Sequence, residues 1–277
     1  MSRKEKIQYK SHEQFLKMRQ AGLVVADIHR ALREKVRAGM TTADADAIAA
    51  EVLERAGSKS NFLGYYGYPG HICTSVNEVI VHGIPGDRVL EPGDLVSFDC
   101  GAVVDGWHGD AAISMVIPGG DPELTARRQR LSDMTEECMW RGIAAAATGS
   151  HVGDIGRAID DFVVGLQEEP GIVEEYVGHG IGTAMHMAPD VPNYRTRSHL
   201  DKLKPGMALC IEPMLTSGSP ENVTLGDDWT VVTLDGGDAC HWEHEIAIHE
   251  RGIWVLTAPD GGIEGLSPYG VVPVPLG

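Results

Sequence analysis

The chain is 277 residues long, with 43% hydrophobic residues, 23% charged residues and a formal net charge of −17 at pH 7. This composition is typical of a globular protein with one or two domains, and the negative charge argues against a general nucleic-acid binder. No apolar run is long enough to span a membrane, the N-terminus lacks the apolar core of a signal peptide, and five scattered cysteines favour reduced thiols, so we expect a cytoplasmic protein.

The N-terminal part of this acidic chain is basic. Residues 1–37 hold ten Lys or Arg against four Asp or Glu. The simpler interpretation is a solvated helix face. The alternative is a weak contact with the ribosome through the four basic residues of the N-terminal arm, which are Arg3, Lys4, Lys6 and Lys10.

Two helices are expected in the first 57 residues. Ser11 and Gln14 form a capping box at the start of the first helix, which should end at Gly39. Apolar residues at steps of 3, 4 and 7 form one stripe along it. The second helix should start near Thr42 and stop at Gly57. Loops and strands follow from residue 61, including a strand at 79–81.

A hairpin is expected where a buried strand ends in acids. Residues 90–99 read as leucine, a Pro-Gly turn and an apolar run that ends at Asp99. Asp105 and Gly106 then carry the signature of a two-residue hairpin turn, which places Gly101 opposite Asp110. Asp99 and Asp110 become diagonal neighbours on one face, roughly 7 Å apart at Cβ or less, and their carboxylates can converge on one cation.

The same order of features recurs in the second half. Asp121 caps a third helix that ends near Gly149, and a fourth helix ends before Pro170. A glycine-rich turn around His179 and a second Leu-x-Pro-Gly block ending at Glu212 follow, then strands at 229–234 and 241–249. We therefore predict an internal duplication within one domain, 1–277. Its parts are an arm at 1–10, two halves at about 11–120 and 121–257, and a surface tail at 258–277.

Four acids and one histidine form a candidate metal site. A carboxylate at the end of a buried strand is costly unless it is paired or bound to a metal. These oxygen-rich ligands suit Mn, Fe(II) or Co, with Zn tolerated. Their four negative charges exceed what one divalent ion needs, so two ions and metal-assisted hydrolysis are expected. The candidates are Asp99, Asp110, His179, Glu212 and Glu243. Alternation puts Glu243 and Glu245 on one strand face, and spacing alone does not say which of them is a ligand.

With these residues, the chain resembles a known family, the type I methionine aminopeptidases, over about residues 11–257. The family has the α+β pita-bread fold, in which pseudo-twofold duplicated halves build a central curved antiparallel sheet flanked by helices. The resemblance rests on Asn77-Glu78-Val79-Ile80-Val81-His82-Gly83-Ile84-Pro85, the hairpin of Asp99 and Asp110, Gly178-His179-Gly180-Ile181-Gly182, Ile211-Glu212-Pro213-Met214 and Glu243-His244.

The resemblance implies a role for each ligand. Asp99, Asp110 and Glu243 would hold one ion, and Asp110, His179, Glu212 and Glu243 the other. A bridging hydroxide would attack the carbonyl after an N-terminal methionine, and Glu212 would carry the proton to the leaving amine. His82 would hydrogen-bond near the scissile amide, and His186 would contact the substrate and the developing oxyanion. The substrates would be Met-peptides and nascent chains with a small second residue, and the enzyme is expected to be a monomer.

The resemblance also implies a methionine pocket with a flexible apolar lining, formed by Phe62, Tyr65, Tyr68, Cys73, Met185 and Trp229. Three residues depart from the family pattern. Met185 stands where an aromatic is common, Phe62 where a small residue is common, and Glu245 where threonine is usual. Because of Met185 and Phe62, the family pattern does not determine the shape of the pocket. Glu245 adds an acid beside the metal ligands.

Two other functions share parts of this pattern. Proline-specific peptidases have the same ligands but usually carry a large N-terminal domain, whereas only about ten residues precede the first helix here. A non-catalytic binding module of the same fold would typically have lost ligands, and this chain keeps all five together with His82 and His186. An N-terminal methionine aminopeptidase remains the favoured prediction.

Overall fold

A computed structural model describes residues 6–167 and 170–277. The capping signals expected from the sequence are present at the first and third helices, and the structure adds a capping box at the second. Ser11 and Thr41 both make complete capping boxes, and Asp121 caps a helix that has Pro122 in its first turn. The helices are α1 (His12–Lys35), α2 (Thr42–Arg55), α3 (Pro122–Thr148), α4 (Gly153–Val164) and α5 (Ile263–Leu266), with 3-10 turns η1 (Tyr65–Gly67) and η2 (Ser267–Tyr269).

The described strands form four antiparallel sheets. The first has the order β1-β4-β2 with β5 paired to β4, the second β15-β14-β9-β7-β8, the third β13-β10-β6 and the fourth β11-β12-β3. The strands are β1 (Lys59–Ser60), β2 (Ile72–Val76), β3 (Val79–Val81), β4 (Leu95–Val104), β5 (Trp107–Val116), β6 (Gly171–Ile172), β7 (Gly178–Gly180), β8 (Met187–Val191), β9 (Ala208–Ile211), β10 (Met214–Thr216), β11 (Asn222–Thr224), β12 (Val231–Thr233), β13 (Ala239–His241), β14 (His244–His249) and β15 (Gly252–Val255).

The hairpin of β4 and β5 has the expected register. Val104 pairs with Trp107 and Gly101 with Asp110, without a bulge along the ten paired positions. Asp105 and Gly106 have φ of 50° and 79°, the two positive values that a type I′ turn requires. The Asp-Gly pair therefore sets which face of the sheet each later side chain occupies.

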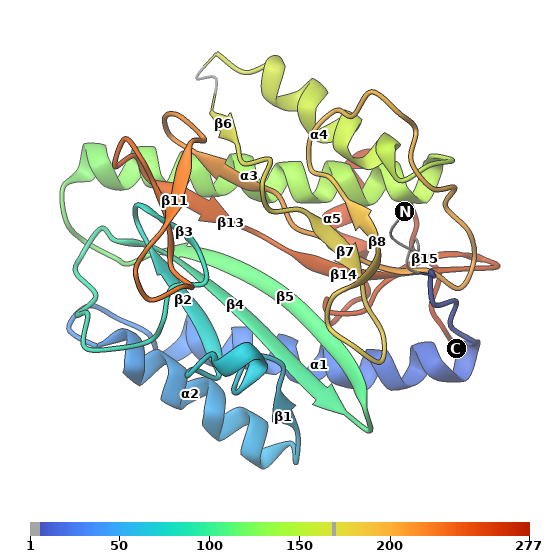
Figure 1. Cartoon of the computed structure of the whole chain (residues 1–277), viewed down its shortest axis with the longest axis horizontal. Coiled ribbons are helices and arrows are strands. Elements are labelled where there is room, and N and C mark those ends of the chain that lie inside the picture. The colour runs from blue at the N-terminus through green and yellow to red at the C-terminus, as the bar shows by residue number, and fades with distance from the viewer. Residues whose placement is uncertain (1–5, 168–169) are drawn as a thin grey trace.

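Helices cover one side of the strands and leave the other side to the loops. In Figure 1, α1 and α2 lie below the long β4–β5 hairpin, and α3 and α4 lie across the top of the molecule. The backbone of α1 reaches the hairpin at two glycines. A Cβ at Gly109 would lie 2.6 Å from the backbone nitrogen of Gly22, which is too close for any side chain. One large apolar core runs from α1 and α2 through β4 and β5 to α3.

Some expected boundaries differ from the structure. The first helix ends at Lys35, four residues before Gly39, because Val36 adopts extended backbone angles. The strand expected at 241–249 is divided into β13 and β14, and Trp242 and Glu243 lie in the break. Residues 258–277 are more than a surface tail, because Leu266 and Leu276 are buried.

The N-terminal arm is anchored to the rest of the molecule. The backbone N–H of Lys10 donates to the carbonyl of Gly206 at 2.7 Å, and the Lys10 side chain is only 6% exposed. Lys10 is therefore unavailable for the alternative interpretation, a ribosome contact, whereas Lys6 is exposed. Arg3 and Lys4 lie outside the described residues. Within the described part of the chain, no helix combines the length and apolarity needed to cross a bilayer.

Candidate metal centre

Three acids lie side by side where the hairpin meets the C-terminal strands. Asp99 pairs with Ala112 across the hairpin. On the other edge of β5, Glu243 exchanges two backbone hydrogen bonds with Ala112, at 3.0 and 3.3 Å. Directly paired residues share a face, and so do residues two apart, so Asp99, Glu243 and Asp110 project together. The small Ala112 side chain between them leaves the space open for their carboxylates.

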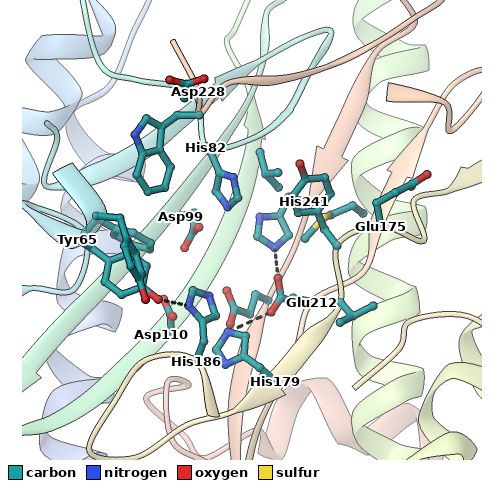
Figure 2. A pocket seen from close by; sticks show the side chains of 18 residues that line it. Tyr65, His82, Asp99, Asp110, Glu175, His179, His186, Glu212, Asp228 and His241 are labelled. Atoms are coloured by element: carbon teal, nitrogen blue, oxygen red, sulfur yellow. Dashed lines mark hydrogen bonds and ion pairs between the residues drawn. The ribbon is translucent and has the colours of Figure 1, made fainter. Parts of the chain in front are cut away.

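Glu212 and His179 come from the second sheet. Glu212 directly follows β9, and its backbone carbonyl accepts a hydrogen bond from the buried amide of Asn193 at 3.0 Å. His179 lies on β7, with its Nε2 3.3 Å from Glu212 Oε1. His241 approaches the other oxygen, with its Nε2 3.7 Å from Glu212 Oε2. Figure 2 shows Glu212 between these two histidines, facing Asp99 and Asp110 across the cavity.

The electrostatics of the site oppose ionisation of its carboxyl groups. Burial raises the pKa of Asp99 to about 7. Burial, followed by the neighbouring carboxylates, raises the pKa of Asp110, Glu212 and Glu243 well above their ordinary values. Four buried acids in one site cannot all ionise without compensation, and the described residues that line the cavity include no Lys or Arg.

The donor set fits divalent metal ions. One buried oxygen on each of the four acids has no hydrogen-bond partner within the described residues, namely Asp99 Oδ1, Asp110 Oδ1, Glu212 Oε1 and Glu243 Oε1. Ligand atoms of Asp110, His179, Cys210 and Glu243 lie within 4.8 Å of one another, and so do those of Glu212, His241 and Glu243. Orphaned buried oxygens grouped at this spacing are what a cation site requires. All five sequence-predicted ligands line the same cavity.

Two further histidines flank the acids. His82 has a φ of 60°, an uncommon backbone conformation for a residue other than glycine. The next residue holds it there, since the carbonyl of Gly83 accepts the N–H of Thr74 at 2.8 Å. Burial, with the neighbouring His186 as a smaller cause, lowers the pKa of His82 to about 4. His186 lies at the open side of the cavity, where its Nδ1 is 2.9 Å from the hydroxyl of Tyr65.

The six residues expected in the methionine pocket come together in one apolar cluster. Phe62, Tyr68, Cys73 and Met185 are buried, and Tyr65 and Trp229 pack against them together with Ile84. Phe62, Tyr65 and Trp229 line the cavity itself. Tyr68, which is 2% exposed, donates its hydroxyl to the carbonyl of Gly83 at 2.9 Å. The apolar cluster and the His82 turn are thereby joined.

The cavity has a volume of about 560 Å³ and contains residues that the sequence analysis did not single out. His241 is the main omission. It has the same parity as Glu243 and Glu245 along the strand-like run, so the alternation could have identified it. No local sequence pattern identifies Tyr176 as a cavity residue, although its ring lies 5.6 Å from that of His82. Glu175 and Asp228 add two acids at the edge of the cavity (Figure 2).

The sequence is similar to metallopeptidases. Residues 16–250 match the model of Metallopeptidase family M24. Methionine aminopeptidase 1 of Mycobacterium tuberculosis is 45% identical over 245 residues, which are 87% of this chain and 91% of the relative. Methionine aminopeptidase 1 of Bacillus subtilis is 43% identical over 240 residues, which are 87% of this chain and 94% of the relative.

The fold is similar to that of solved methionine aminopeptidases. The crystal structure of the enzyme from Rickettsia prowazekii superposes with a TM-score of 0.86 at 31% sequence identity, covering 91% of this chain and 100% of that one. Sequence and structure thus point to the same group of proteins.

Proposed function

The chain belongs to the methionine aminopeptidases of metallopeptidase family M24, and we propose that its cavity removes the N-terminal methionine from peptides and newly made proteins. We infer a preference for a small second residue, which the family resemblance implies. The observation that carries the proposal is the convergence of Asp99, Asp110, Glu212, Glu243 and His179 on one cavity beside an apolar cluster. The fold is the α+β pita-bread fold, and its use of divalent metal follows from the family and the donor set.

The metal ligands are proposed residue by residue. Asp99, Asp110 and Glu243 would hold one ion, and Asp110, His179, Glu212 and Glu243 a second. Mn, Fe(II), Co and Zn all suit this set of oxygen and imidazole ligands. When bound, the ions supply Lewis acidity and lower the pKa of water towards neutrality.

Glu212 is the proposed proton carrier. It is 8% exposed and lies between His179 and His241, with its carboxyl group on the cavity. In the absence of metal, burial and the nearby acids raise its pKa, and a carboxyl group can act as a general base and as a general acid. We propose that Glu212 takes a proton from the attacking water and gives it to the leaving amine.

His82 and His186 are the proposed hydrogen-bond donors to the substrate. His82 is neutral at pH 7 because its pKa is about 4, and a neutral imidazole still has one N–H to donate. If the Tyr65 hydroxyl donates to Nδ1 of His186, Nε2 of His186 carries the proton and can donate to the developing oxyanion. Donors placed where charge develops are worth about 10²–10³ in kcat.

The methionine side chain would occupy the apolar cluster. Trp229 stands between the cluster and His82, with its ring 5.1 Å from that of Tyr68 and 6.1 Å from that of His82. A side chain held against these rings would bring the following peptide bond towards His82 and the acids. The buried thiol of Cys73 and the thioether of Met185 add polarizable sulfur atoms to the apolar cluster, which suits a flexible thioether.

The proposal is tested on metal-stripped protein with each ion added back. We expect release of methionine from Met-Ala-Ser with at least one divalent ion, and no hydrolysis of an Ala-Pro peptide. Cleavage of Ala-Pro in preference to Met-Ala-Ser would favour a proline-specific peptidase instead. Absence of hydrolysis with every ion, together with retained metal binding, would favour a binding module.

A further inference from the structure

One more buried histidine faces the proposed ligands. His241 is the last residue of β13 and is 2% exposed. Its Nε2 has no hydrogen-bond partner within residues 6–167 and 170–277, and Figure 2 shows its ring pointing towards Glu212. A buried polar atom without a partner is uncommon in a native protein and needs an explanation. The four acids of the centre share this feature, and for them a bound cation explains it.

Two buried serines hold the backbone of His241 against the hairpin. Ser97 of β4 accepts the His241 N–H through its Oγ at 3.1 Å, and the hydroxyl of Ser114 of β5 donates to the His241 carbonyl at 2.8 Å. The two serine hydroxyls also lie 2.7 Å apart. Ser97 is two residues before Asp99, so the strand that carries a proposed ligand also fixes the backbone of His241. The sheet therefore determines where this imidazole ring lies.

The spacing of the ring nitrogens around Glu212 suits metal ligands. His179 Nε2 lies 3.3 Å from Glu212 Oε1, and His241 Nε2 lies 3.7 Å from Glu212 Oε2. Two ligand atoms that are each about 2.1 Å from one ion are at most about 4.2 Å apart. A separation of 3.7 Å is too long for a hydrogen bond, so Glu212 alone does not satisfy the nitrogen of His241. Glu243 offers a carboxylate oxygen within 4.8 Å of a ligand atom of each, a distance that a small rotation of a carboxyl group closes.

We propose that His241 is a further protein ligand of the metal centre, and that its Nε2 binds an ion together with Glu212 and Glu243. The inference rests on the proposed function, since it adds a ligand to the proposed centre. The five ligands proposed above contain one imidazole, and His241 makes two. Imidazole suits Zn and Fe, whereas carboxylates suit Mn and Mg. His241 therefore shifts the preference of the centre from Mn²⁺ towards metals such as Zn²⁺.

The first test is calorimetric titration of metal-stripped protein with Zn²⁺ and with Mn²⁺. His241→Gln removes the imidazole and keeps a side chain that can hydrogen-bond to Glu212. We expect it to weaken Zn²⁺ binding by about tenfold or more, and Mn²⁺ binding by less. His82→Gln, which changes another histidine of the same cavity, is the matched control and should leave both affinities unchanged.

Three outcomes of the titration would contradict the proposal. An unchanged Zn²⁺ affinity in His241→Gln would overturn His241 as a ligand. Equal losses for Zn²⁺ and Mn²⁺ would overturn the shift in metal preference. An equal loss in His82→Gln would show that any change in this cavity weakens metal binding, and would overturn the specific role of His241.

The second test needs no variant, so it decides the question even if His241→Gln does not fold. Wild-type protein labelled with ¹⁵N at histidine is studied by NMR before and after addition of two equivalents of Zn²⁺. Two imidazole rings, those of His179 and His241, should take the resonance of a metal-bound nitrogen. One such ring would overturn the proposal for His241 and leave the proposed function intact. Absence of any metal-bound ring would contradict both.

Discussion

At the scale of single residues, the site is defined by oxygen atoms without partners. The unpartnered oxygens of Asp99, Asp110, Glu212 and Glu243 carry a desolvation cost that no described hydrogen bond offsets. A bound cation offsets this cost, so ligand arrangement and protein stability are linked in this molecule. The linkage makes stability in the absence of metal a sensitive measure of the site.

Metal-free protein should lose stability as the pH rises above about 6.5. A carboxyl whose pKa is raised by folding stabilises the folded state below its unfolded pKa, and that stability is lost as the pH rises to the folded pKa. For Asp99 the window runs from 3.8 to about 7, and burial and the neighbouring carboxylates raise the pKa of the other three acids in the same direction. Within its window, each such group lowers the free energy of unfolding by about 1.4 kcal/mol per pH unit.

Histidines act in the opposite direction at lower pH. His179 and His241 have pKa values lowered to about 3 by burial, so their stabilisation is lost as the pH falls below 6.5. Above 6.5 these histidines are neutral in both states and no longer contribute to the change of stability with pH. Urea unfolding between pH 6.5 and 9, with chelator and with saturating Mn²⁺, measures the difference. A metal-free protein that gained stability over this range would contradict the assignment.

His82→Ala should lower kcat by about 10²-fold and leave the metal content unchanged, since His82 is a proposed donor to the substrate and not a proposed ligand. Steady-state kinetics on Met-Ala-Ser, with metal analysis of the same samples, separates the two effects. His199→Ala, an exposed histidine outside the cavity, is the matched control. A loss of metal in His82→Ala equal to its loss of activity would argue for a ligand role.

At the scale of elements, the hairpin depends on direct contact with α1. Gly109 precedes Asp110, and any Cβ there would meet the backbone of Ala21 and Gly22 at 2.6–3.0 Å. Gly109→Ala should therefore push α1 away from β5 and destabilise the protein by about 1–3 kcal/mol. Urea unfolding measures this change. Gly86→Ala, which meets nothing within 4 Å, should be close to neutral.

The elements were predictable where local chemistry decides them. The capping boxes at Ser11 and Thr41 and the Asp105-Gly106 turn are local signals, and the turn set the parity of Asp99 and Asp110 correctly. The helix start expected near Thr42 is confirmed, although Thr41 was not predicted as its N-cap. The fold and family prediction is confirmed by the comparisons.

The remaining features depend on long-range contacts. The break at Trp242 and Glu243 arises because Glu243 pairs with Ala112 of β5, a contact that no local pattern reveals. Lys10 was interpreted as a surface cation, and its burial against Gly182 depends on a loop more than 170 residues later in the chain. The roles of the proposed ligands and of the methionine pocket remain predictions.

At the scale of the whole molecule, the charge of −17 should favour cationic substrates. Glu175 and Asp228 bring this field to the edge of the cavity. We expect kcat/KM for Met-Ala-Lys-Lys to exceed that for Met-Ala-Ser-Ser at low ionic strength, and the advantage to shrink at roughly 0.5 M salt, where the Debye length is only a few Å. Asp228→Asn should reduce the advantage, and a ratio that is independent of salt would contradict this explanation.

The hydrogen bonds between Ala112 and Glu243 also predict the order in which parts of the protein fold. They join residues 131 positions apart, and contacts of such sequence separation are made late because closing a long loop costs entropy first. The hairpin of Asp99 and Asp110 can form early, but it lacks its partners until the last strands are in place. The metal site is therefore complete only when the fold is nearly complete. Bound metal should mainly slow unfolding and leave the rate of folding nearly unchanged.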